Sequence, residues 1–320
     1  MKVVLFCGGL GTRLRDYSDQ IPKPLVEIGS RPILWHVMRY YAHYGFKDFI
    51  LCLGYRGSSI KSYFRSYDEC LSNDFVFSKG GRTIDLLQSD IDGWKITFVD
   101  TGQRSNIGER LRAVRKYVEP DDVFLANYSD GLTDLDCAAY VESFLKRDKI
   151  GSFLSVRVPQ TFHIVHANRE HELEKLEYVG DAALRINGGY FAFRKEIFNH
   201  INEGEELVNQ PFHRLAAKHQ IMAVPHDGFW RSMDTFRDKI ELDELVSRGR
   251  APWQVWMPER ELRSAWTPAA CGVRSRSCWR ERPRRGLRLR CTRCRAGASP
   301  PRRSRRGTSR ARPGSSSAAR

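Results

Sequence analysis

A glycine-rich turn near the N-terminus is the first group of residues that could do chemistry. The run Gly8-Gly9-Leu10-Gly11-Thr12-Arg13-Leu14 follows a short apolar stretch. The backbone N–H groups of such a turn can approach a polyphosphate, and Arg13 would neutralise part of its charge. The turn is not a Walker A loop, since no Gly-Lys-Ser/Thr follows at the required spacing, and it lacks the third glycine of the dinucleotide pattern G-x-G-x-x-G. These two nucleotide-binding motifs are therefore excluded.

A lysine in a rigid setting follows the glycine turn. Lys23 stands between two prolines in Pro22-Lys23-Pro24-Leu25-Val26-Glu27-Ile28-Gly29. Because prolines fix their own φ angles, the lysine is held in a set direction. A rigid cation close to a glycine turn suits a phosphate. A surface lysine in a proline turn is the alternative that this segment leaves open.

Two aspartates stand next to turn-forming residues. Asp130 lies in Tyr128-Ser129-Asp130-Gly131, directly after the apolar run Val123–Ala126, and Asp234 lies in Met233-Asp234-Thr235. Taken alone, each has a structural explanation, because aspartate forms turns beside glycine and caps the first turn of helices. Their chemical role depends on where the fold puts them.

Strands and helices that alternate along the chain must position these residues. Apolar and β-branched runs predict strands, and apolar residues at helical intervals predict helices. This alternation predicts an α/β fold with a doubly wound, mostly parallel, Rossmann-like mixed sheet. The glycine turn and Asp130 would then lie at the carboxyl ends of strands, where ligands bind in such sheets. The predicted strands are Val3–Cys7, Phe49–Leu53, Trp94–Val99, Val123–Ala126, Phe153–Val158, Gly189–Phe193 and Met222–Val224, and the predicted helices are Ile33–Tyr41, Ile60–Tyr67, Leu111–Val118, Ala138–Lys146, Pro211–Lys218 and Asp238–Ser247.

The basic charge of the chain is concentrated at its C-terminal end. The whole sequence has a formal net charge of +15, but residues 257–320 contain 19 Arg, no Lys and three Glu, which leaves residues 1–256 with a net charge of −1. We therefore divide the chain into a domain over residues 1–256 and an Arg-rich tail over residues 257–320. The charge of the domain does not support nucleic-acid binding.

The tail has little with which to form a core, because Ile, Asn, Gln, Phe, Tyr and His are missing from it. It is predicted to be disordered. Two origins stay open. The joint absence of residues with A/T-rich codons fits a frameshift near residue 257, and the rival is a genuine basic arm that binds nucleic acid or anionic lipid.

Cysteine spacing and hydropathy exclude several further classes. The four cysteines of the domain show no disulfide or metal-binding spacing, and Cys291-Thr-Arg-Cys294 lacks the second pair that a zinc site needs. No apolar run reaches the ~20 residues of a membrane span, and the N-terminal run is too short for a signal peptide. We expect a cytoplasmic protein with no membrane partner.

Taken together, these motifs resemble the sugar-phosphate nucleotidyltransferases over residues 1 to about 256. The glycine turn, the Pro-Lys-Pro segment and the Ser-Asp-Gly after a buried strand carry that resemblance. The glucose-1-phosphate cytidylyltransferase branch is the most similar. The segments that indicate this branch are Pro32–His36, Gly54–Gly57, Val99–Gly102, Arg110-Leu111, Ile186–Gly189, Gly228–Trp230 and Met233–Thr235.

The resemblance implies a fold of the nucleotide-diphospho-sugar transferase type and a role for each matched residue. Asp130 and Asp234 match the two carboxylates that hold Mg²⁺, and Arg13, Lys23 and Asp130 match the catalytic residues. Two carboxylates with substrate phosphates suit Mg²⁺, and a sugar phosphate is already an anionic nucleophile, so catalysis needs placement and charge neutralisation rather than a protein base. The positions that match nucleotide contacts are Phe6, Cys7, Gly8, Gly9, Leu10, Gly11, Thr12, Arg13, Lys23, Ser105, Arg110 and Ser129.

The sugar-phosphate side departs from the family pattern. Glu177, Tyr178, Asn187 and Gly188 match its contacts, but Tyr178 stands where the family usually has a lysine. A phenol donates one hydrogen bond and carries no charge at neutral pH, so affinity for a phosphate dianion should fall.

Three explanations of this tyrosine stay open. Lys175 or Arg185 substitutes for the missing lysine, the acceptor sugar differs, or the protein is a divergent, non-catalytic homologue that binds nucleotide sugars. His163 and His166 lie in the same departing stretch, and we interpret them as solvent-exposed side chains rather than metal ligands.

The reaction that the resemblance implies is transfer of CMP from CTP to glucose 1-phosphate, with CDP-glucose and pyrophosphate as products. CDP-glucose would serve deoxysugar or surface-polysaccharide synthesis, such as that of lipopolysaccharide or O-antigen. The family also implies a homo-oligomer.

Overall fold

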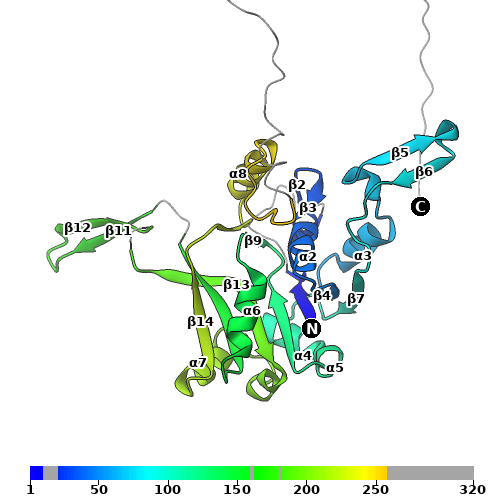
Figure 1. The fold of residues 1–320 in the computed structure, drawn as a ribbon. Helices are drawn as coiled ribbons and strands as arrows, with labels where there is room; N and C mark the ends of the chain where they lie inside the picture. The colour runs from blue at the N-terminus through cyan, green and yellow to red at the C-terminus, as the bar shows by residue number, and fades with distance from the viewer. Residues whose placement is uncertain (10–20, 159–161, 181, 258–320) are drawn as a thin grey trace, which may run out of the picture. The chain divides into compact units, whose positions relative to one another are not determined.

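The computed structural model describes residues 1–9, 21–158, 162–180 and 182–257 (Figure 1). Within these ranges the chain forms a seven-stranded sheet in the order β14-β10-β13-β8-β1-β4-β7, in which β13 is antiparallel to both of its neighbours and the other pairings are parallel. The predicted α/β fold with a mostly parallel sheet is confirmed. The strands are β1 (Lys2–Phe6), β4 (Asp48–Leu53), β7 (Lys95–Asp100), β8 (Val123–Asn127), β10 (Gly151–Arg157), β13 (Arg185–Arg194) and β14 (Ile221–His226).

Both faces of the sheet are buried, because helices cover each of them. Successive side chains of a strand point to opposite faces. Accordingly, Val3 and Leu5 of β1 belong to one hydrophobic core, whereas Val4 and Phe6 belong to the other. This double burial explains why β1, β4 and β8 are continuous apolar runs rather than alternating ones.

Each core is closed by its own set of helices. The first core includes side chains from α2 (Ile33–His43), α3 (Gly57–Arg65), α6 (Cys137–Leu145) and α8 (Phe236–Ser247). The second includes side chains from α4 (Ile107–Ala113), α5 (Arg115–Val118), the 3₁₀ helix η5 (Lys195–His200) and α7 (Gln210–Ala217).

The predicted helix over Leu111–Val118 is in fact two helices. It begins earlier, at Ile107, and a break at Val114 separates α4 from α5. Asn106 and Glu109 form a capping box at the start of α4, with both reciprocal hydrogen bonds present. This signal was available in the sequence and would have corrected the start.

Four two-stranded ladders lie outside the main sheet in the described part of the chain. The sequence analysis did not predict them, because their strands are short and several carry exposed apolar residues instead of a clear alternation. The ladders are β2 (Glu27–Ile28) with β3 (Arg31–Pro32), β5 (Phe75–Ser78) with β6 (Thr83–Leu86), β9 (Gly131–Thr133) with β15 (Trp230–Ser232), and β11 (His163–Ala167) with β12 (Leu173–Tyr178).

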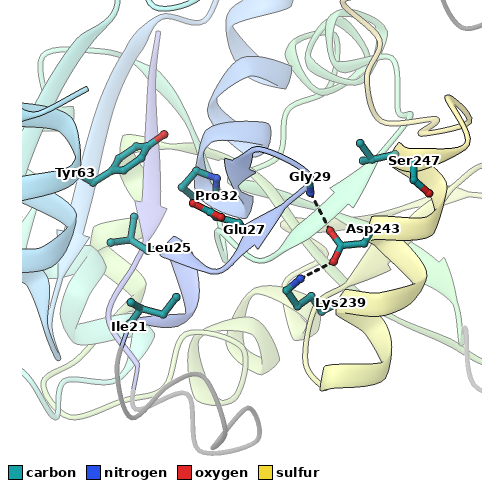
Figure 2. A pocket seen from close by; sticks show the side chains of 10 residues that line it. Ile21, Leu25, Glu27, Gly29, Pro32, Tyr63, Lys239, Asp243 and Ser247 are labelled. Atoms are coloured by element: carbon teal, nitrogen blue, oxygen red, sulfur yellow. Dashed lines mark hydrogen bonds and ion pairs between the residues drawn. The ribbon is translucent and has the colours of Figure 1, made fainter. Parts of the chain in front are cut away.

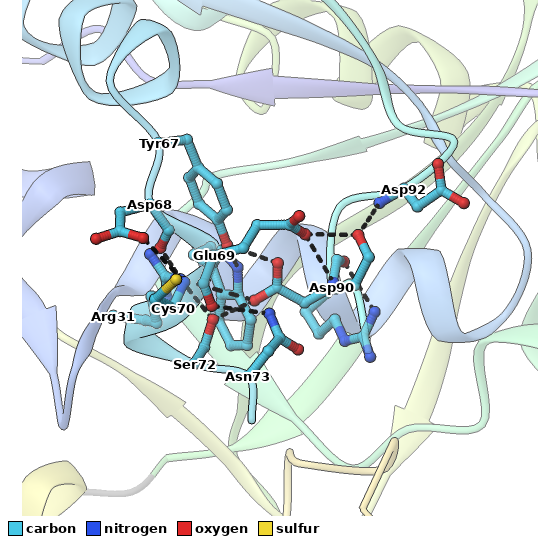
Figure 3. Close-up of polar contacts among 12 residues, drawn as sticks. Arg31, Tyr67, Asp68, Glu69, Cys70, Ser72, Asn73, Asp90 and Asp92 are labelled. Atoms are coloured by element: carbon cyan, nitrogen blue, oxygen red, sulfur yellow. Dashed lines mark hydrogen bonds and ion pairs between the residues drawn. The ribbon is translucent and has the colours of Figure 1, made fainter. Parts of the chain in front are cut away.

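A buried ion cluster, the Arg31–Asp90 cluster, anchors the segment that carries β5 and β6 (Figure 3). Arg31 and Asp90 are only 2% and 4% exposed, with Arg31 Nη2 and Asp90 Oδ2 3.8 Å apart. Arg31 also donates hydrogen bonds to the backbone oxygen of Asp68 (2.7 Å) and to the Ser72 hydroxyl. Ser72 and Tyr67 donate in turn to the Asp90 carboxylate. Neutral hydrogen-bonding groups thus surround both charges.

No helix in the described residues is long and apolar enough to cross a membrane. Of the predicted tail, all but Met257 lies outside the described residues.

Candidate active site

Three charged side chains from distant parts of the chain meet at the carboxyl edge of the sheet. Lys23 begins the 3₁₀ helix η2 (Lys23–Leu25), Asp130 lies three residues after β8, and Asp234 lies two residues after β15. Lys23 Nζ is 2.6 Å from Asp130 Oδ2 and 2.8 Å from Asp234 Oδ1. The structure therefore brings together the predicted catalytic lysine and both predicted metal ligands.

The ladder β9–β15 sets the two carboxylates side by side. Gly131, directly after Asp130, pairs with Ser232. The backbone N–H of Met233 donates to the backbone oxygen of Asp130 (2.9 Å), and Ser232 Oγ donates to Asp234 Oδ2 (2.8 Å). Asp234 is thus held on both oxygens.

The helix-cap alternative for Asp234 does not describe its side chain. Thr235 is the N-cap residue of α8, and Asp238 completes the capping box. Asp234 contributes only its backbone N–H to Asp238 (3.0 Å), whereas its carboxylate faces Lys23 and Ser232. The cap instead fixes the chain direction immediately after Asp234.

The far end of the β9–β15 ladder is tied by an ion pair. His226, the last residue of β14, has its Nε2 3.0 Å from Asp134 Oδ1. The hydrogen bond to Asp134 is the main cause that raises the pKa of His226, against the effect of burial. Burial would raise the pKa of Asp134, but hydrogen bonds from His226 and the backbone hold it below its ordinary value.

The charges of the Lys23–Asp130–Asp234 cluster are mutually dependent. Burial opposes the charge of Lys23, but Asp130 and Asp234 outweigh it and raise the pKa of the ammonium. Burial raises the pKa of Asp130, although Lys23 acts in the opposite direction. A partly buried carboxylate of this kind is stabilised in its charged form by a cation placed against it.

A strained backbone presents Asp130. Ser129 has φ +66°, in the left-handed region that side-chain-bearing residues rarely adopt. The conformation is fixed by two hydrogen bonds, from the Ser129 N–H to Asn127 Oδ1 (2.7 Å) and from Ser129 Oγ to the backbone oxygen of Phe6 (2.9 Å). The second bond joins the end of β1 to the turn that carries Asp130.

A cavity of about 260 Å³ opens beside this cluster. It contains the described part of the glycine turn together with Lys23, Ser129 and Asp130, as the sequence analysis grouped them. Burial raises the pKa of Cys7 to about 12, so its thiol stays protonated at neutral pH. The lining residues are Phe6, Cys7, Gly8, Gly9, Lys23, Pro24, Ile107, Tyr128, Ser129 and Asp130.

Arg110 lies beneath the glycine turn rather than in the open cavity. It is 1% exposed, and a Cβ on Gly8 would come within 2.1 Å of its Nη1 atom. That nitrogen donates to Thr101 Oγ1 (2.7 Å) and to the backbone oxygens of Gly102 (2.9 Å) and Leu53 (3.2 Å), all of which are neutral acceptors. Glycine is thus required at position 8 for this close approach. Arg110 is a buried positive charge behind the turn.

Ser105 supports the same region from its own turn. Its hydroxyl donates to the backbone oxygen of Thr101 (2.6 Å), and a Cβ on Gly102 would lie 2.7 Å from it. Gly102 has φ +92°, a conformation that glycine adopts without strain. The predicted nucleotide contact of Ser105 stays a prediction.

The sugar-phosphate residues fall into two groups. Asn187 Nδ2 donates to the hydroxyl of Tyr128 (3.2 Å), and the backbone oxygen of Gly188 accepts from Trp230 Nε1 (2.8 Å). These two predicted residues therefore contact the cavity wall and β15. Tyr128, which lines the cavity, was not among the predicted site residues, although it lies in a motif that the sequence analysis quoted.

Glu177 and Tyr178 lie instead on the β11–β12 hairpin. Glu177 pairs with Lys175 (2.7 Å) and His166 (3.4 Å), and the Tyr178 ring packs against His163 with their centroids 5.8 Å apart. In the described part of the chain, no hydrogen bond or ion pair joins this pair to the cavity. Leu10, Gly11, Thr12 and Arg13 lie outside the described residues.

A second cavity, of about 790 Å³, lies between η2, the β2–β3 ladder and α8, the helix that begins two residues after Asp234 (Figure 2). It is lined by residues of η2, the β2–β3 turn and α8. The Gly29 N–H donates to Asp243 Oδ1 (2.9 Å), and Lys239 pairs with the same carboxylate (2.5 Å). The first bond ties α8 to the β2–β3 turn, which follows η2 in the chain, and the second lies within α8.

Carboxylate oxygens that converge on one point fit a hard divalent cation. Asp130 Oδ2 and Asp234 Oδ1 both lie within hydrogen-bond distance of the same nitrogen. Among the described residues there is no group of three or more His, Cys, Asp or Glu side chains suited to a metal. A cation at this point would therefore need further oxygens, such as those of phosphates or water, as Mg²⁺ sites commonly use.

Known proteins resemble this chain in both sequence and fold. Residues 2–235 match the family model described as nucleotidyl transferase. The chain is 39% identical over 259 residues to glucose-1-phosphate cytidylyltransferase from Salmonella typhimurium, which covers 80% of this chain and 100% of that relative. It is 24% identical over 247 residues to mannose-1-phosphate guanyltransferase from Yarrowia lipolytica, which covers 74% of this chain and 62% of the relative.

A solved structure shares the fold of this chain. A solved structure of UDP-glucose pyrophosphorylase complexed with UDP-glucose superposes with a TM-score of 0.55 at 15% identity, covering 77% of this chain and 97% of that one. The range that the family model matches includes the glycine turn, Lys23, Asp130 and Asp234. The chain is a nucleotidyltransferase enzyme and belongs to the nucleotidyl transferase family.

Proposed function

We propose that the protein transfers CMP from CTP to glucose 1-phosphate in a Mg²⁺-dependent reaction that releases pyrophosphate. The observation that carries this proposal is the Lys23–Asp130–Asp234 cluster at the edge of the glycine-turn cavity. The choice of CTP and glucose 1-phosphate rests on the 39% identity to the Salmonella cytidylyltransferase.

The cavity residues support binding of the nucleotide. Gly8 and Gly9 expose backbone to the cavity, and the buried guanidinium of Arg110 behind Gly8 adds a positive potential where phosphates would lie. Ser129 orients the turn at Asp130, and Arg13 is proposed to neutralise the reacting phosphates together with Lys23.

Asp130 and Asp234 are the proposed ligands of the Mg²⁺ ion. When bound, the ion would neutralise charge that builds up on the phosphates. The chain's own residues then have to place the sugar phosphate in line with the α-phosphorus. They also have to exclude competing water, which the buried strand ends around Phe6 and Tyr128 favour.

Asn187 and Gly188 are proposed to contact the sugar phosphate from the wall formed with Tyr128 and Trp230. We propose that the acceptor side is compensated or altered at Tyr178, rather than lost. A Tyr178→Lys variant tests this point. A rise in kcat/KM for glucose 1-phosphate would identify the tyrosine as the limiting residue, and an unchanged value would show that other residues already supply the charge.

The decisive experiment measures pyrophosphate release for each of the four NTPs with several sugar 1-phosphates. We expect turnover with CTP and glucose 1-phosphate, and loss of turnover in Asp130→Asn. Turnover with another pair would correct the substrates. Nucleotide binding without turnover for every pair would favour the alternative, a non-catalytic nucleotide-sugar-binding homologue.

The setting of the reaction follows from the same proposal. CDP-glucose would feed deoxysugar or surface-polysaccharide synthesis in the cytoplasm, and the active unit would be a homo-oligomer. Size-exclusion chromatography with light scattering would measure the oligomeric state directly.

A further inference from the structure

The Lys23 ammonium lies where two carboxylates converge, and this position is the one that a bound cation would need. The Nζ atom is 2.6 Å from Asp130 Oδ2 and 2.8 Å from Asp234 Oδ1. Magnesium–oxygen distances are about 2.0–2.1 Å. Two oxygens that close in on one nitrogen at hydrogen-bond length leave no separate position between them for a second cation.

Charge also opposes simultaneous occupancy. Among the described residues the cluster holds two carboxylates and one ammonium, and a divalent cation could take the place of the lysine in neutralising these carboxylates. With both present, two cations would lie a few ångströms apart in a site where the Lys23 side chain is only 16% exposed. Two like charges a few ångströms apart repel each other even in a partly hydrated site.

A phosphate bound in the neighbouring cavity would give the Lys23 ammonium an alternative partner. Lys23 lines the cavity of the glycine turn together with Gly8 and Gly9, and the prolines on either side restrict its backbone. An anionic phosphate in that cavity would offer the ammonium a new partner on the same wall. Asp130 and Asp234, by contrast, are fixed by the β9–β15 ladder and by Ser232.

We infer that Lys23 acts as an exchangeable internal cation, which fills the divalent-cation position in the ligand-free enzyme and moves to the nucleotide phosphates when the cation binds. This inference rests on the proposed assignment of Asp130 and Asp234 as cation ligands. The cation and the triphosphate then bind cooperatively. The cation displaces the Lys23 ammonium from the carboxylates, and the triphosphate binds the displaced ammonium. The ligand-free site is kept neutralised and closed to stray metal.

A binding experiment with Mn²⁺ as the probe tests the exchange without catalysis. Free Mn²⁺ is measured by electron paramagnetic resonance in the wild-type full chain, in Lys23→Met and in the control Lys239→Met. The control removes one positive charge from the same domain, at a lysine paired with Asp243. We expect Lys23→Met to bind Mn²⁺ about tenfold more tightly than wild type in the absence of nucleotide, and Lys239→Met to bind as wild type does.

The coupling to nucleotide gives the second readout. CTP should tighten Mn²⁺ binding to the wild type by a larger factor than to Lys23→Met, because the variant has no ammonium left to displace. Equal Mn²⁺ affinity in wild type and Lys23→Met, or an equal CTP effect, would overturn the exchange. An equal gain in Lys239→Met would also overturn it, since net charge alone would then explain the result.

A measurement on the unmodified protein covers the case in which Lys23→Met fails to fold. The acetylation rate of the Lys23 amine, followed by mass spectrometry, should rise when Mn²⁺ is added and fall again when CTP is added with it. A rate that does not respond to Mn²⁺ contradicts the exchange. Failure of the exchange can be told apart from failure of the proposed function. If only the exchange is wrong, pyrophosphate release persists while the acetylation rate of Lys23 does not respond to the metal.

Discussion

The Lys23–Asp130–Asp234 cluster and the Arg31–Asp90 cluster contain the same kinds of charge in different surroundings. Lys23 has two charged partners and borders a cavity, whereas Arg31 is 2% exposed and donates mainly to neutral oxygens. Asp130 is held to one movable ammonium, but Asp90 accepts from Tyr67 and Ser72 as well. We therefore expect an ion pair to be exchangeable when its partners are charges beside a cavity, and structural when neutral hydrogen bonds enclose it.

Replacing Arg31, the enclosed cation of the Arg31–Asp90 cluster, should have the largest effect on stability. Arg31→Met leaves Asp90 buried and without its counter-charge, which costs about 3–5 kcal/mol of unfolding free energy. Urea denaturation followed by fluorescence measures this loss. The control Arg248→Met removes an exposed i,i+4 partner of Glu244 and should change stability by about 0.5 kcal/mol or less. Equal stability of the two variants would remove the distinction between the clusters.

Replacing Lys23, the cation that borders the cavity, should affect activity rather than stability. Lys23→Met is expected to lower kcat/KM for pyrophosphate release by about 10²–10³-fold, as loss of one charge-stabilising group typically does. The unfolding free energy should fall by about 1 kcal/mol or less, because the Asp130 and Asp234 side chains are 25% and 37% exposed and remain hydrated. A collapse of stability comparable to that of Arg31→Met would contradict this expectation.

Paired substitutions sharpen the contrast. Arg31→Met with Asp90→Leu removes both buried charges, and we expect it to regain about 1–4 kcal/mol relative to Arg31→Met alone. Lys23→Met with Asp130→Asn also removes a pair, but it should regain no pyrophosphate release. Double-mutant cycles on both pairs measure these outcomes. Recovery of activity in the Lys23→Met, Asp130→Asn double variant would show that the Lys23–Asp130–Asp234 cluster is only structural.

The His226–Asp134 pair is expected to have a smaller effect on stability than the Arg31–Asp90 cluster. Its ion pair exists only while His226 carries a proton. The pKa of His226 is raised above its ordinary value of 6.5, so its stabilising contribution is fully present below pH 6.5 and is lost as the pH rises through the raised pKa. The pKa of Asp134 is lowered from 3.8, so its contribution is lost only as the pH falls through that lowered value. We expect His226→Gln to cost about 1 kcal/mol at pH 6 and less at pH 9, measured by urea denaturation at both values. A loss that is the same at both pH values would mean that packing, not the proton, explains it.

The sequence predicted the apolar strands and the grouping at their carboxyl ends, because burial on both faces leaves continuous apolar runs such as Val123–Ala126. Lys23 and Asp130, which the pattern placed near the glycine turn, line one cavity with its described part, and Ser129, which was grouped with them through the family resemblance, lines it too. The convergence of Asp234 was reached only through family resemblance, since nothing local in Met233-Asp234-Thr235 reveals the ladder that pairs β15 with β9.

Other features were not predictable from local patterns. The burial of Arg110 under Gly8 depends on a long-range approach between two turns, and an isolated arginine suggests an exposed ligand contact. The Arg31–Asp90 cluster joins residues far apart in sequence through neutral hydrogen bonds, which leave no periodic signal. The four short ladders were not predicted for a similar reason, because strands of two to six residues, several with exposed apolar side chains, do not establish an alternation.

The β9–β15 ladder has a consequence for the order in which the parts of the site are assembled during synthesis. Asp234 contacts Lys23 across 211 residues of sequence, and Asp130 contacts it across 107. A nascent chain that has emerged only through β13 already contains the glycine turn, Lys23 and Asp130, but not the strand that supplies the second carboxylate. Contacts between such distant residues also close late during folding. The proposed cation position is therefore completed only when nearly the whole domain has been made.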